Sequence, residues 1–303
     1  MVPRGYNGKL IIKSNTLDLS FFEFNLMPSE KFNLIGKTAL ITGAAGLLGY
    51  EHACALLETN SNLVLTDIDL DKLNNIKKEL EINYPYSDIY IHELNVTSKT
   101  SIMEVYKKLV STKIHVDILI NNAAMNPKVE KESIVNDGGR LESFPLENWN
   151  AEIAIGLTGA FLCSQIFGSA MAKSNKEGII LNIASDLSVI APDQRIYKNN
   201  LLNESEQPVK PVTYSVIKSG LVGLTKYLAT YWLGKNIRCN SISPGGVYSN
   251  QSDEFVKKLS SLIPLGRMAY KDEYRSAIQF LCSDASSYLN GHNLVMDGGR
   301  SIW

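Results

Sequence analysis

The sequence predicts an α/β protein in which helices cover both faces of a parallel β-sheet. From Lys37 onward, short apolar runs alternate with helical patterns of roughly 12–20 residues. The runs are apolar throughout, which is typical of strands that are buried on both faces. The predicted strands are Thr38–Thr42, Leu63–Thr66, Ile89–Leu94, Val116–Ile120, Ile179–Ile183, Ile237–Ile242 and Leu294–Met296. The predicted helices cover 47–58, 70–82, 99–111, 148–173, 214–234 and 271–282.

Right-handed connections turn this alternation into a Rossmann-type doubly wound sheet of about seven strands. We expect residues 37–303 to form one domain of this kind. Residues 1–36 precede the pattern and are too few for a second domain, so we expect an N-terminal extension that is an arm or partly disordered.

Composition and charge exclude several classes of protein. The chain has 303 residues, 45% of them hydrophobic, and a formal net charge of −1 with acidic and basic residues interspersed. This balance argues against a nucleic-acid or membrane partner. No apolar run reaches the roughly 18 residues of a membrane helix, and no signal peptide is evident, so we expect a cytoplasmic protein. The four cysteines and four histidines are scattered, so no metal site is predicted.

A glycine-rich turn follows the first predicted strand and precedes a helix, with glycines at Gly43, Gly46 and Gly49. Such a turn lets the backbone approach a pyrophosphate, and the helix N-terminus offers free N–H groups to it. Tight packing alone is the alternative explanation. The position between strand and helix favours a cofactor phosphate site.

Asp67 and Ile68 follow the second strand. A carboxylate at this place accepts hydrogen bonds from ribose hydroxyls and repels a 2′-phosphate, so Asp67 predicts NAD in preference to NADP. The alternative is a loop or N-cap aspartate, because Asp69 and Asp71 stand close by.

Polar and small residues follow the next strands. Asn95 and Val96 come after the third, and Asn122, Ala123 and Ala124 after the fourth. The asparagines have an alternative role in satisfying loop backbone groups. The two alanines leave room for a flat ring or a ribose.

Tyr214 stands four residues before Lys218, so in a helix both side chains share one face. A nearby ammonium favours the phenolate, which would let Tyr214 exchange a proton with a substrate oxygen. The spacing alone is weak, because Tyr231 and Lys235 repeat it. Ser185, after the fifth strand, is placed to bond the same oxygen or to cap a turn. Pro244 to Ser249, after the sixth strand, reads as a mobile loop over a cofactor.

In this order, the segments TGAAGLLG, Asp67, NVT, NNAA, Ser185, YSVIK, PGG and DGG resemble the short-chain dehydrogenase/reductase superfamily in its compact form. The resemblance implies a single-domain Rossmann fold and hydride transfer between a nicotinamide and an alcohol or carbonyl carbon. It implies that Tyr214 is the acid/base, Lys218 its pKa-lowering and ribose-binding partner, and Ser185 the residue orienting the substrate. For cofactor binding it implies Gly43, Gly46, Leu48, Gly49, Asp67, Ile68, Asn95, Val96, Asn122, Ala123, Ala124, Tyr214, Lys218, Pro244, Gly245 and Val247.

Three features depart from the family pattern. The glycine spacing is that of the family's extended branch, although too little chain follows Lys218 for that branch's substrate domain. Gly156 replaces the usual asparagine of the proton relay. The segment 186–212 between Ser185 and Tyr214 is unusually long; we expect it to cover the substrate, with little structure of its own, and to meet the polar loop 126–146 across the cleft.

A narrower similarity is to oxidoreductases of bacterial flagellin glycosylation and nonulosonic (legionaminic-type) acid biosynthesis, which implies a sugar or sugar-phosphate substrate. The resulting hypothesis is an NAD(H)-dependent oxidoreductase that interconverts a hydroxyl and a carbonyl group, working as a homodimer or homotetramer. The alternatives are a non-catalytic NAD-binding scaffold and an epimerase or dehydratase that retains its NAD.

Overall fold

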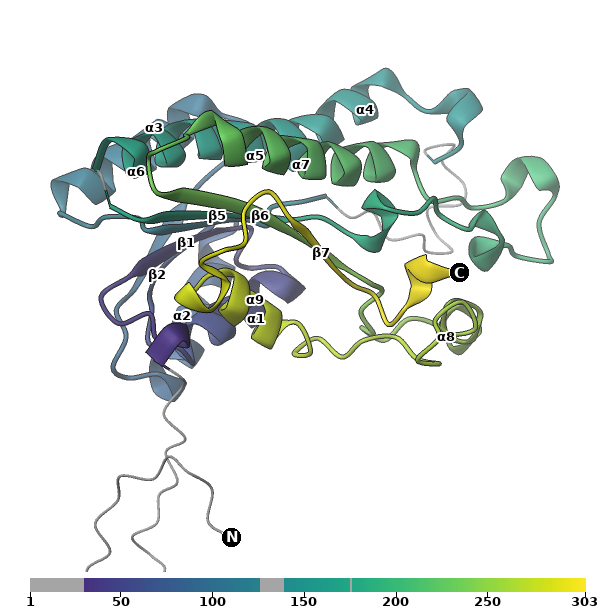
Figure 1. Cartoon of the computed structure of the whole chain (residues 1–303). Helices are drawn as coiled ribbons and strands as arrows, with labels where there is room; N and C mark the ends of the chain where they lie inside the picture. Colours follow the sequence, from purple (N-terminus) through teal and green to yellow (C-terminus); the bar gives the residue numbers. More distant parts are fainter. Residues whose placement is uncertain (1–29, 126–138, 175) are drawn as a thin grey trace, which may run out of the picture.

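A seven-stranded parallel sheet forms the centre of the molecule in a computed structural model that describes residues 30–125, 139–174 and 176–303 (Figure 1). The strand order is β3-β2-β1-β4-β5-β6-β7, with every neighbouring pair parallel. The strands are β1 (Thr38–Thr42), β2 (Asn62–Asp67), β3 (Ile89–Glu93), β4 (Ile118–Asn121), β5 (Gly178–Ile183), β6 (Ile237–Pro244) and β7 (Asn293–Met296). The predicted fold class is confirmed, and each predicted strand is present with its ends shifted by about two residues at most.

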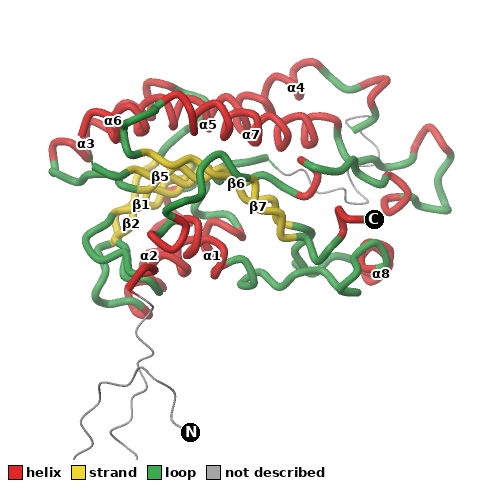
Figure 2. The backbone as a smooth tube through the Cα atoms, in the orientation of Figure 1, coloured by secondary structure: helices red, strands yellow, loops and turns green. Residues whose placement is uncertain are grey.

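Helices cover both faces of the sheet (Figures 1 and 2). One layer contains α3 (Lys99–Ser111), α4 (Leu146–Ile153), α5 (Gly159–Cys163), α6 (Ser169–Ser174) and α7 (Val212–Tyr231). The other contains α1 (Leu47–Leu57), α2 (Leu70–Asn83) and α9 (Arg275–Leu281). Successive residues of a strand pack against opposite helix layers, because their side chains point alternately to the two faces of the sheet. Leu40 packs in the cluster with α3, whereas Ile41 packs in the cluster with α1 and α9.

The helix predicted at 148–173 is one continuous helical stretch from Leu146 to Ser174, in which two π-helical turns, Ala154–Thr158 and Ser164–Gly168, separate α4, α5 and α6. By length and composition alone this stretch is long and apolar enough to cross a membrane. The core helix of a globular domain passes the same test, and here Cys163, Phe167 and Met171 are buried against the sheet. The apolar composition of this helix is therefore explained by its burial against the sheet.

One helix was missed by the sequence analysis, α8 (Asp253–Ser260). Its signals are a Ser252 N-cap that accepts from Phe255 N, acidic residues in the first turn and lysines in the last. It lies at the end of the molecule where the carboxyl ends of β6 and β7 point (Figure 1). The helix predicted at 271–282 is shorter than expected, because only Arg275–Leu281 is α-helical.

The inserted segment 186–212 has more structure than the sequence suggested. It contains three 3-10 turns, Asp186–Ser188, Gln194–Tyr197 and Glu204–Glu206. The buried Gln207 side chain orders the chain between the second and third turns, since it accepts from Asn199 N and donates to the carbonyls of Asn199 and Leu202. This internal bonding explains why a stretch without apolar periodicity is ordered.

The inserted segment packs on α8. Ile196 and Tyr197 join Phe255 and Leu259 in a small apolar cluster of their own, and Lys258 Nζ donates to Lys198 O at 2.8 Å. Of the polar loop predicted at 126–146, residues 126–138 lie outside the described residues. The described part contacts the segment through Arg140, whose Nη1 donates to Glu204 O at 2.8 Å.

The N-terminal extension predicted at 1–36 is described only from Glu30. Glu30–Phe32 forms a 3-10 turn, and Leu34 is buried in the core, where its N–H donates to Thr59 O at 2.7 Å. The last residues of this segment are therefore part of the domain. The arm expected for 1–29 lies outside the described residues.

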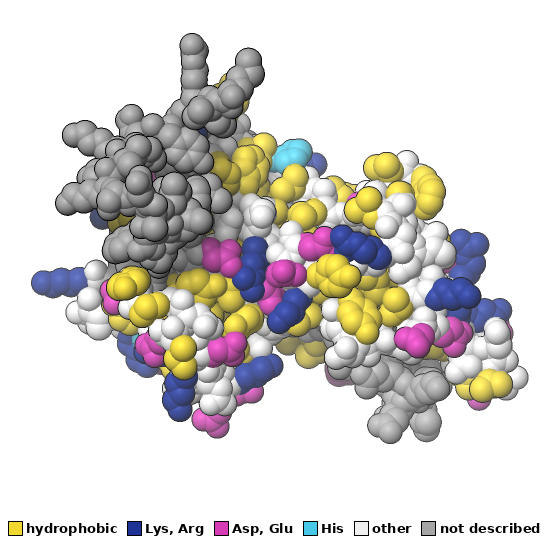
Figure 3. Space-filling model, turned by 90° about the horizontal axis from the view of Figure 1, so that it is seen from below, with side chains coloured by type: hydrophobic (Ala, Val, Ile, Leu, Met, Phe, Trp, Pro, Cys, Tyr) yellow, Lys and Arg dark blue, Asp and Glu magenta, His cyan; other side chains and the backbone are white. Residues whose placement is uncertain are grey.

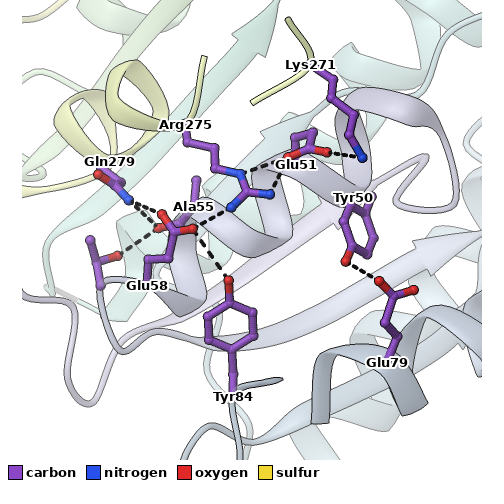
Figure 4. A network of polar contacts seen from close by, with 10 residues as sticks. Tyr50, Glu51, Ala55, Glu58, Glu79, Tyr84, Lys271, Arg275 and Gln279 are labelled. Carbon is purple, nitrogen blue, oxygen red and sulfur yellow. Dashed lines mark hydrogen bonds and ion pairs between the residues drawn. The ribbon is translucent and has the colours of Figure 1, made fainter. Parts of the chain in front are cut away.

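A network of charged and polar side chains joins α1 to α9 (Figure 4). Glu51 is fully buried on α1, and its Oε2 accepts from Arg275 Nε at 2.8 Å while its Oε1 pairs with Lys271 Nζ at 3.1 Å. Arg275 also donates to Glu58, which in turn accepts from Gln279. The face shown in Figure 3 carries acidic and basic side chains interspersed, as the sequence predicts, and no field of a single sign.

Candidate active site

A cavity of about 810 Å³ opens at the carboxyl ends of the strands. This is where a doubly wound sheet places its ligand, because the strand order reverses between β1 and β4. The turns after β1, β2, β3, β4, β5 and β6 all contribute to its wall, together with α7 and α8. Among the predicted site residues the cavity is lined by Gly43, Gly46, Leu48, Asp67, Ile68, Asn95, Val96, Asn122, Ala123, Ala124, Ser185, Tyr214, Lys218, Pro244, Gly245 and Val247.

Gly49 is the one predicted site residue that does not line the cavity, and its role is close packing. A Cβ at Gly49 would collide with the carbonyl oxygen of Gly43. Gly43 has φ +64°, and a Cβ there would lie 2.7 Å from Ala123 Cα. The two glycines therefore allow the turn to fold tightly between β1 and the start of α1 at Leu47, whose first N–H groups have no partner within the helix.

The Asn122 side chain stabilises the glycine turn by hydrogen bonds to its backbone. Its Nδ2 donates to the carbonyls of Thr42 and Gly43 at 3.0 and 2.9 Å, and its own N–H donates to Thr42 Oγ1. Both amide donors are thus engaged by the protein. Asn122 lines the cavity together with Ala123 and Ala124, whose small side chains follow it in the chain.

Asp67 ends β2 and faces the cavity. Its Oδ2 accepts from Ala45 N at 3.0 Å, so the carboxylate also fixes the glycine turn, and its Oδ1 accepts from Asp69 N. The N-cap of α2 is Asp69, which accepts from Lys72 N. The helix-capping alternative therefore applies to Asp69, and Asp67 stands at the place where a ribose would lie.

Asn95 and Val96 form the wall after β3. The Asn95 side chain closes its own turn by accepting from Thr97 N and Thr97 Oγ1. Val96 is buried against Gly159, where a Cβ would come within 2.9 Å of the Val96 side chain. These side chains shape the wall, which leaves backbone groups and the Val96 surface for a planar ring.

Ser185, Tyr214 and Lys218 all line this cavity. Ser185 follows β5, and its Oγ donates to Asp186 Oδ1 at 2.8 Å and accepts from Leu187 N. Tyr214 and Lys218 lie one turn apart on α7, and Lys218 Nζ is 5.6 Å from the centre of the Tyr214 ring. Lys218 is buried and donates to Ile183 O at 2.8 Å, which fixes its ammonium between β5 and Tyr214.

Burial is the largest cause of the pKa shifts of Tyr214 and Lys218. It raises the pKa of the Tyr214 phenol; the Ser185 hydrogen bond opposes this and the Asp186 charge adds to it. The sequence analysis expected Lys218 to lower the pKa of Tyr214, but in the structure this pKa is raised and desolvation is the largest cause. Burial, helped by the Lys210 charge, lowers the pKa of Lys218 to about 8. Lys218 is consequently a cation that can still titrate slightly above neutral pH.

The segment after β6 was expected to be a mobile loop. In the structure, backbone hydrogen bonds join it to Ala269. Ala269 N donates to Gly246 O, and Tyr248 N donates to Ala269 O. A Cβ at Gly245 would lie 2.8 Å from Asp297 Cα, so this glycine allows the turn to pass the end of β7. Pro244, Gly245 and Val247 thus form a fixed wall of the cavity.

Gly156 sits in the first π-helical turn and is buried against α7. A Cβ at this position would lie 2.7 Å from Ile217 Cγ2. The asparagine that the family usually has here therefore does not fit unless Ile217 moves. One turn earlier, the buried Glu152 accepts a short hydrogen bond from Thr213 Oγ1 at the start of α7.

His52 lies fully buried on α1, beside Asn122, and among the described residues neither of its ring nitrogens has a hydrogen-bond partner. Burial lowers its pKa to about 3, with Asn122 opposing the shift.

Because the unfolded chain protonates His52 near pH 6.5 and the folded protein does not, the free energy of unfolding should fall by about 1.4 kcal/mol per pH unit below 6.5. Urea titrations at pH 7, 6 and 5 should show a shallower fall for His52→Leu, whereas His292→Gln, at an exposed position, should match the parent protein. An equal slope in His52→Leu would contradict the assignment.

Several cavity residues were not predicted as site residues. Lys210 and Tyr197 come from the inserted segment, Gln251 and Phe255 from the region of α8, and Arg300 from the turn after β7. Lys210 belongs to the segment 186–212 that was expected to cover the substrate, and its place over Tyr214 depends on how that segment folds. Arg300 follows DGG directly, and this position beyond a strand end is the signal that could have identified it.

Comparison with known proteins agrees with this geometry. A family profile described as short chain dehydrogenase matches residues 37–197, and one described as enoyl-(acyl carrier protein) reductase matches residues 203–301. The chain is 32% identical to the NAD-dependent glycerol dehydrogenase of Listeria innocua, covering 90% of this chain and 97% of that protein. It is 30% identical to the D-threitol dehydrogenase of Mycolicibacterium smegmatis, covering 89% and 95%.

Among solved structures, a short chain dehydrogenase from Leptospira borgpetersenii with bound NAD+ superposes with a TM-score of 0.76 and 28% identity. The match covers 98% of this chain and all of that one, 100%. Sequence, sheet order and cavity position lead to one conclusion: the chain belongs to the short-chain dehydrogenase/reductase family, whose enzymes act on CH–OH groups with a nicotinamide cofactor.

Proposed function

We propose that this protein is an NAD(H)-dependent dehydrogenase that interconverts a hydroxyl and a carbonyl group on a polyol or sugar-like substrate. The observation that carries the proposal is the meeting of Ser185, Tyr214 and Lys218 in one cavity with the glycine turn and Asp67. A protein that only binds NAD does not need a buried lysine one turn after a tyrosine on the same helix, with its ammonium held by a carbonyl of β5.

The residues present fit a dinucleotide. The turn at Gly43 and Gly49 has no room for a Cβ, and the N-terminus of the 11-residue α1 supports a pyrophosphate. Asp67 offers acceptors for ribose hydroxyls, and Val96 and Ala124 provide apolar wall. The nicotinamide, when bound, supplies the carbon that exchanges a hydride with the substrate.

The chain's own groups then handle the proton and the geometry. In oxidation, the Tyr214 oxygen takes the proton of the substrate hydroxyl, and in reduction it returns that proton. The Lys218 cation stabilises the negative charge on Tyr214 during this exchange and is held in place by Ile183 O. Ser185 orients the substrate oxygen, with Asp186 fixing the direction of the Ser185 hydroxyl.

The proposed substrate class draws on the relatives named above, which act on glycerol and D-threitol according to their names. The wall of the inserted segment supports it, because Tyr197 and Lys210 give it polar groups for a hydroxylated molecule. A role in flagellin glycosylation or nonulosonic acid synthesis finds no support in these relatives and is not part of the proposed function.

The test is NADH formation at 340 nm with a panel of polyols, sugars and their oxidised forms. Turnover that requires added NAD is the expected result. Binding of NAD without turnover on any alcohol would favour a scaffold. A product formed without net NADH, by protein that copurifies with NAD, would favour an epimerase or dehydratase.

Asp67 is proposed to set the preference for NAD over NADP. Asp67→Asn removes the charge that repels a 2′-phosphate but retains an oxygen for Ala45 N. We expect kcat/KM for NADP to rise relative to that for NAD by at least about tenfold, a change on the order of one ion-pair energy. Asp69→Asn, at the α2 N-cap, is the control. An unchanged ratio in Asp67→Asn would show that Asp67 only braces the turn.

A homodimer or homotetramer is also proposed. Leu157 and Ile153 are partly buried beside Leu221 of α7, and Phe161 and Val216 are exposed on the same layer. These apolar side chains suit a symmetric contact between two copies of the layer. A monomer in light scattering would contradict the proposal.

A further inference from the structure

Arg300 lies inside the cavity with a guanidinium only partly used by the protein. It starts a 3-10 turn after β7, is 8% exposed, and donates from Nη1 to Asp186 Oδ2 at 2.7 Å. Among the described residues this is the only hydrogen bond of its side chain, and Arg300 lines the cavity. A guanidinium this deep normally has all its donors satisfied, because burying unpaired donors is unfavourable.

Lys210 brings a second cation to the same place. Its Nζ stands 3.8 Å from the centre of the Tyr214 ring. Its backbone is fixed by Gln194, which accepts from Lys210 N and donates to Lys210 O. This pair of hydrogen bonds fixes the backbone from which the Lys210 side chain reaches the tyrosine ring.

Both cations line the cavity close to the reacting groups, since Arg300 pairs with Asp186 next to Ser185 and Lys210 covers the Tyr214 ring. The charges of Arg300 and Asp186 and the phenol of Tyr214 all act on the pKa of Tyr197, which burial raises to about 12. The charge of Asp186 also favours the protonated form of Lys210, because it raises the pKa of this lysine against the effect of burial. Asp186 is already occupied, because its Oδ1 accepts from Ser185 and Leu187 and its Oδ2 from Arg300. One carboxylate thus faces two cations beside the reacting groups.

We propose that the substrate carries an anionic group, a carboxylate or a phosphate, which Arg300 binds and Lys210 assists, while its reacting hydroxyl lies at Ser185 and Tyr214. Arginine suits this task because its planar donors match both oxygens of such a group. The proposal rests on the proposed function and narrows its substrate from polyols in general to polyols with an acidic end. The inserted segment, through Lys210, and the turn after β7, through Arg300, would then together favour substrates that carry an acidic group.

The first experiment compares matched substrates in the presence of NAD: glycerol and erythritol as neutral polyols, glycerate and gluconate as carboxylates, and glycerol 3-phosphate as a phosphate. We expect kcat/KM to be about 10- to 100-fold higher for at least one acidic series than for the neutral series, the range for one charged hydrogen bond. The two acidic series distinguish a carboxylate from a phosphate. Equal or higher kcat/KM for the neutral polyols would overturn the proposal and leave the proposed function intact.

Variants then locate the effect. In Arg300→Met we expect kcat/KM for the preferred acidic substrate to fall by about 10- to 100-fold more than kcat/KM for the neutral polyols, while KM for NAD stays unchanged. Lys210→Met should give a smaller fall of the same kind. The control is Arg195→Met, since the Arg195 side chain is 86% exposed and pairs with Asp193 in the same segment. Equal loss for neutral and acidic substrates in Arg300→Met would indicate a structural role.

A binding measurement covers the case in which none of these alcohols is oxidised. The fluorescence of the enzyme–NADH complex is titrated with malonate, inorganic phosphate and propane-1,3-diol. Saturable binding of one anion that weakens about tenfold or more in Arg300→Met supports the proposal even if the proposed activity fails. Because Arg300→Met leaves Asp186 without its partner, the double variant Asp186→Asn/Arg300→Met is measured beside it. Anion binding that persists in both variants, or is absent from the parent protein, overturns the proposal.

Discussion

Replacing Tyr214 by phenylalanine is expected to lower kcat by about 10²- to 10⁴-fold, the range that a positioned acid–base group contributes. The change removes one oxygen and leaves the ring that Lys210 covers. NAD binding should therefore be unchanged, because the glycine turn and Asp67 lie on other elements. Single-turnover NADH formation measures the loss, and the fluorescence of bound NADH measures the binding.

A matched control is present on the same helix. Tyr231 also precedes a lysine by four residues, but it is 62% exposed at the end of α7 and stacks on Tyr227. Tyr231→Phe should have the activity of the parent protein. Full activity in Tyr214→Phe would contradict the assignment, whereas equal losses in both variants would point to a general effect on α7.

The sequence was sufficient to predict the sheet and the positions of the groups that follow its strands. Leu40 and Ile41 show why: each strand is buried on both faces, so its apolar run is continuous and easily recognised. Once the strands are parallel, their carboxyl ends share one edge. Asp67, Ser185 and Val247 then had to lie near the same cavity.

The sequence did not predict how these residues are used. Asn122 bears two amide donors, and only the structure assigns both to the glycine turn. The folding of segment 186–212 on α8 depends on Gln207 bonding backbone groups five and eight residues away and on contacts of Tyr197 with Phe255. Contacts of this kind leave no period in the sequence. The place of Lys210 in the cavity wall, over Tyr214, follows from that packing alone.

The Gly156 position illustrates a departure that the structure explains in part. The sequence analysis noted that an expected asparagine is absent. The structure adds that Ile217 occupies the space which its side chain would need. The substitution and the neighbouring isoleucine therefore form one packing unit, and a Gly156→Asn change tests both together.

Replacing Arg275 by methionine is expected to lower the free energy of unfolding by about 3 kcal/mol, at the lower end of the cost of breaking a buried ion pair. The Glu51 side chain is 1% exposed, and two nitrogens of Arg275 donate to its Oε2 at 2.8 and 2.5 Å (Figure 4). Lys271 keeps its contact with Glu51 Oε1 in the variant, which limits the loss. Urea titration at pH 7 measures the change.

The reason for the loss is the carboxylate left behind, and further variants test this reason. Glu51→Leu/Arg275→Met removes the buried carboxylate together with its partner and should recover most of the stability, since an apolar pair of similar volume avoids the desolvation cost. Arg267→Met breaks an ion pair with Glu273 in which both side chains are exposed by a third or more, so it should cost at most about 1 kcal/mol. If Arg275→Met costs no more than Arg267→Met, the contact between α1 and α9 rests on apolar packing, and the charged network adds little to it.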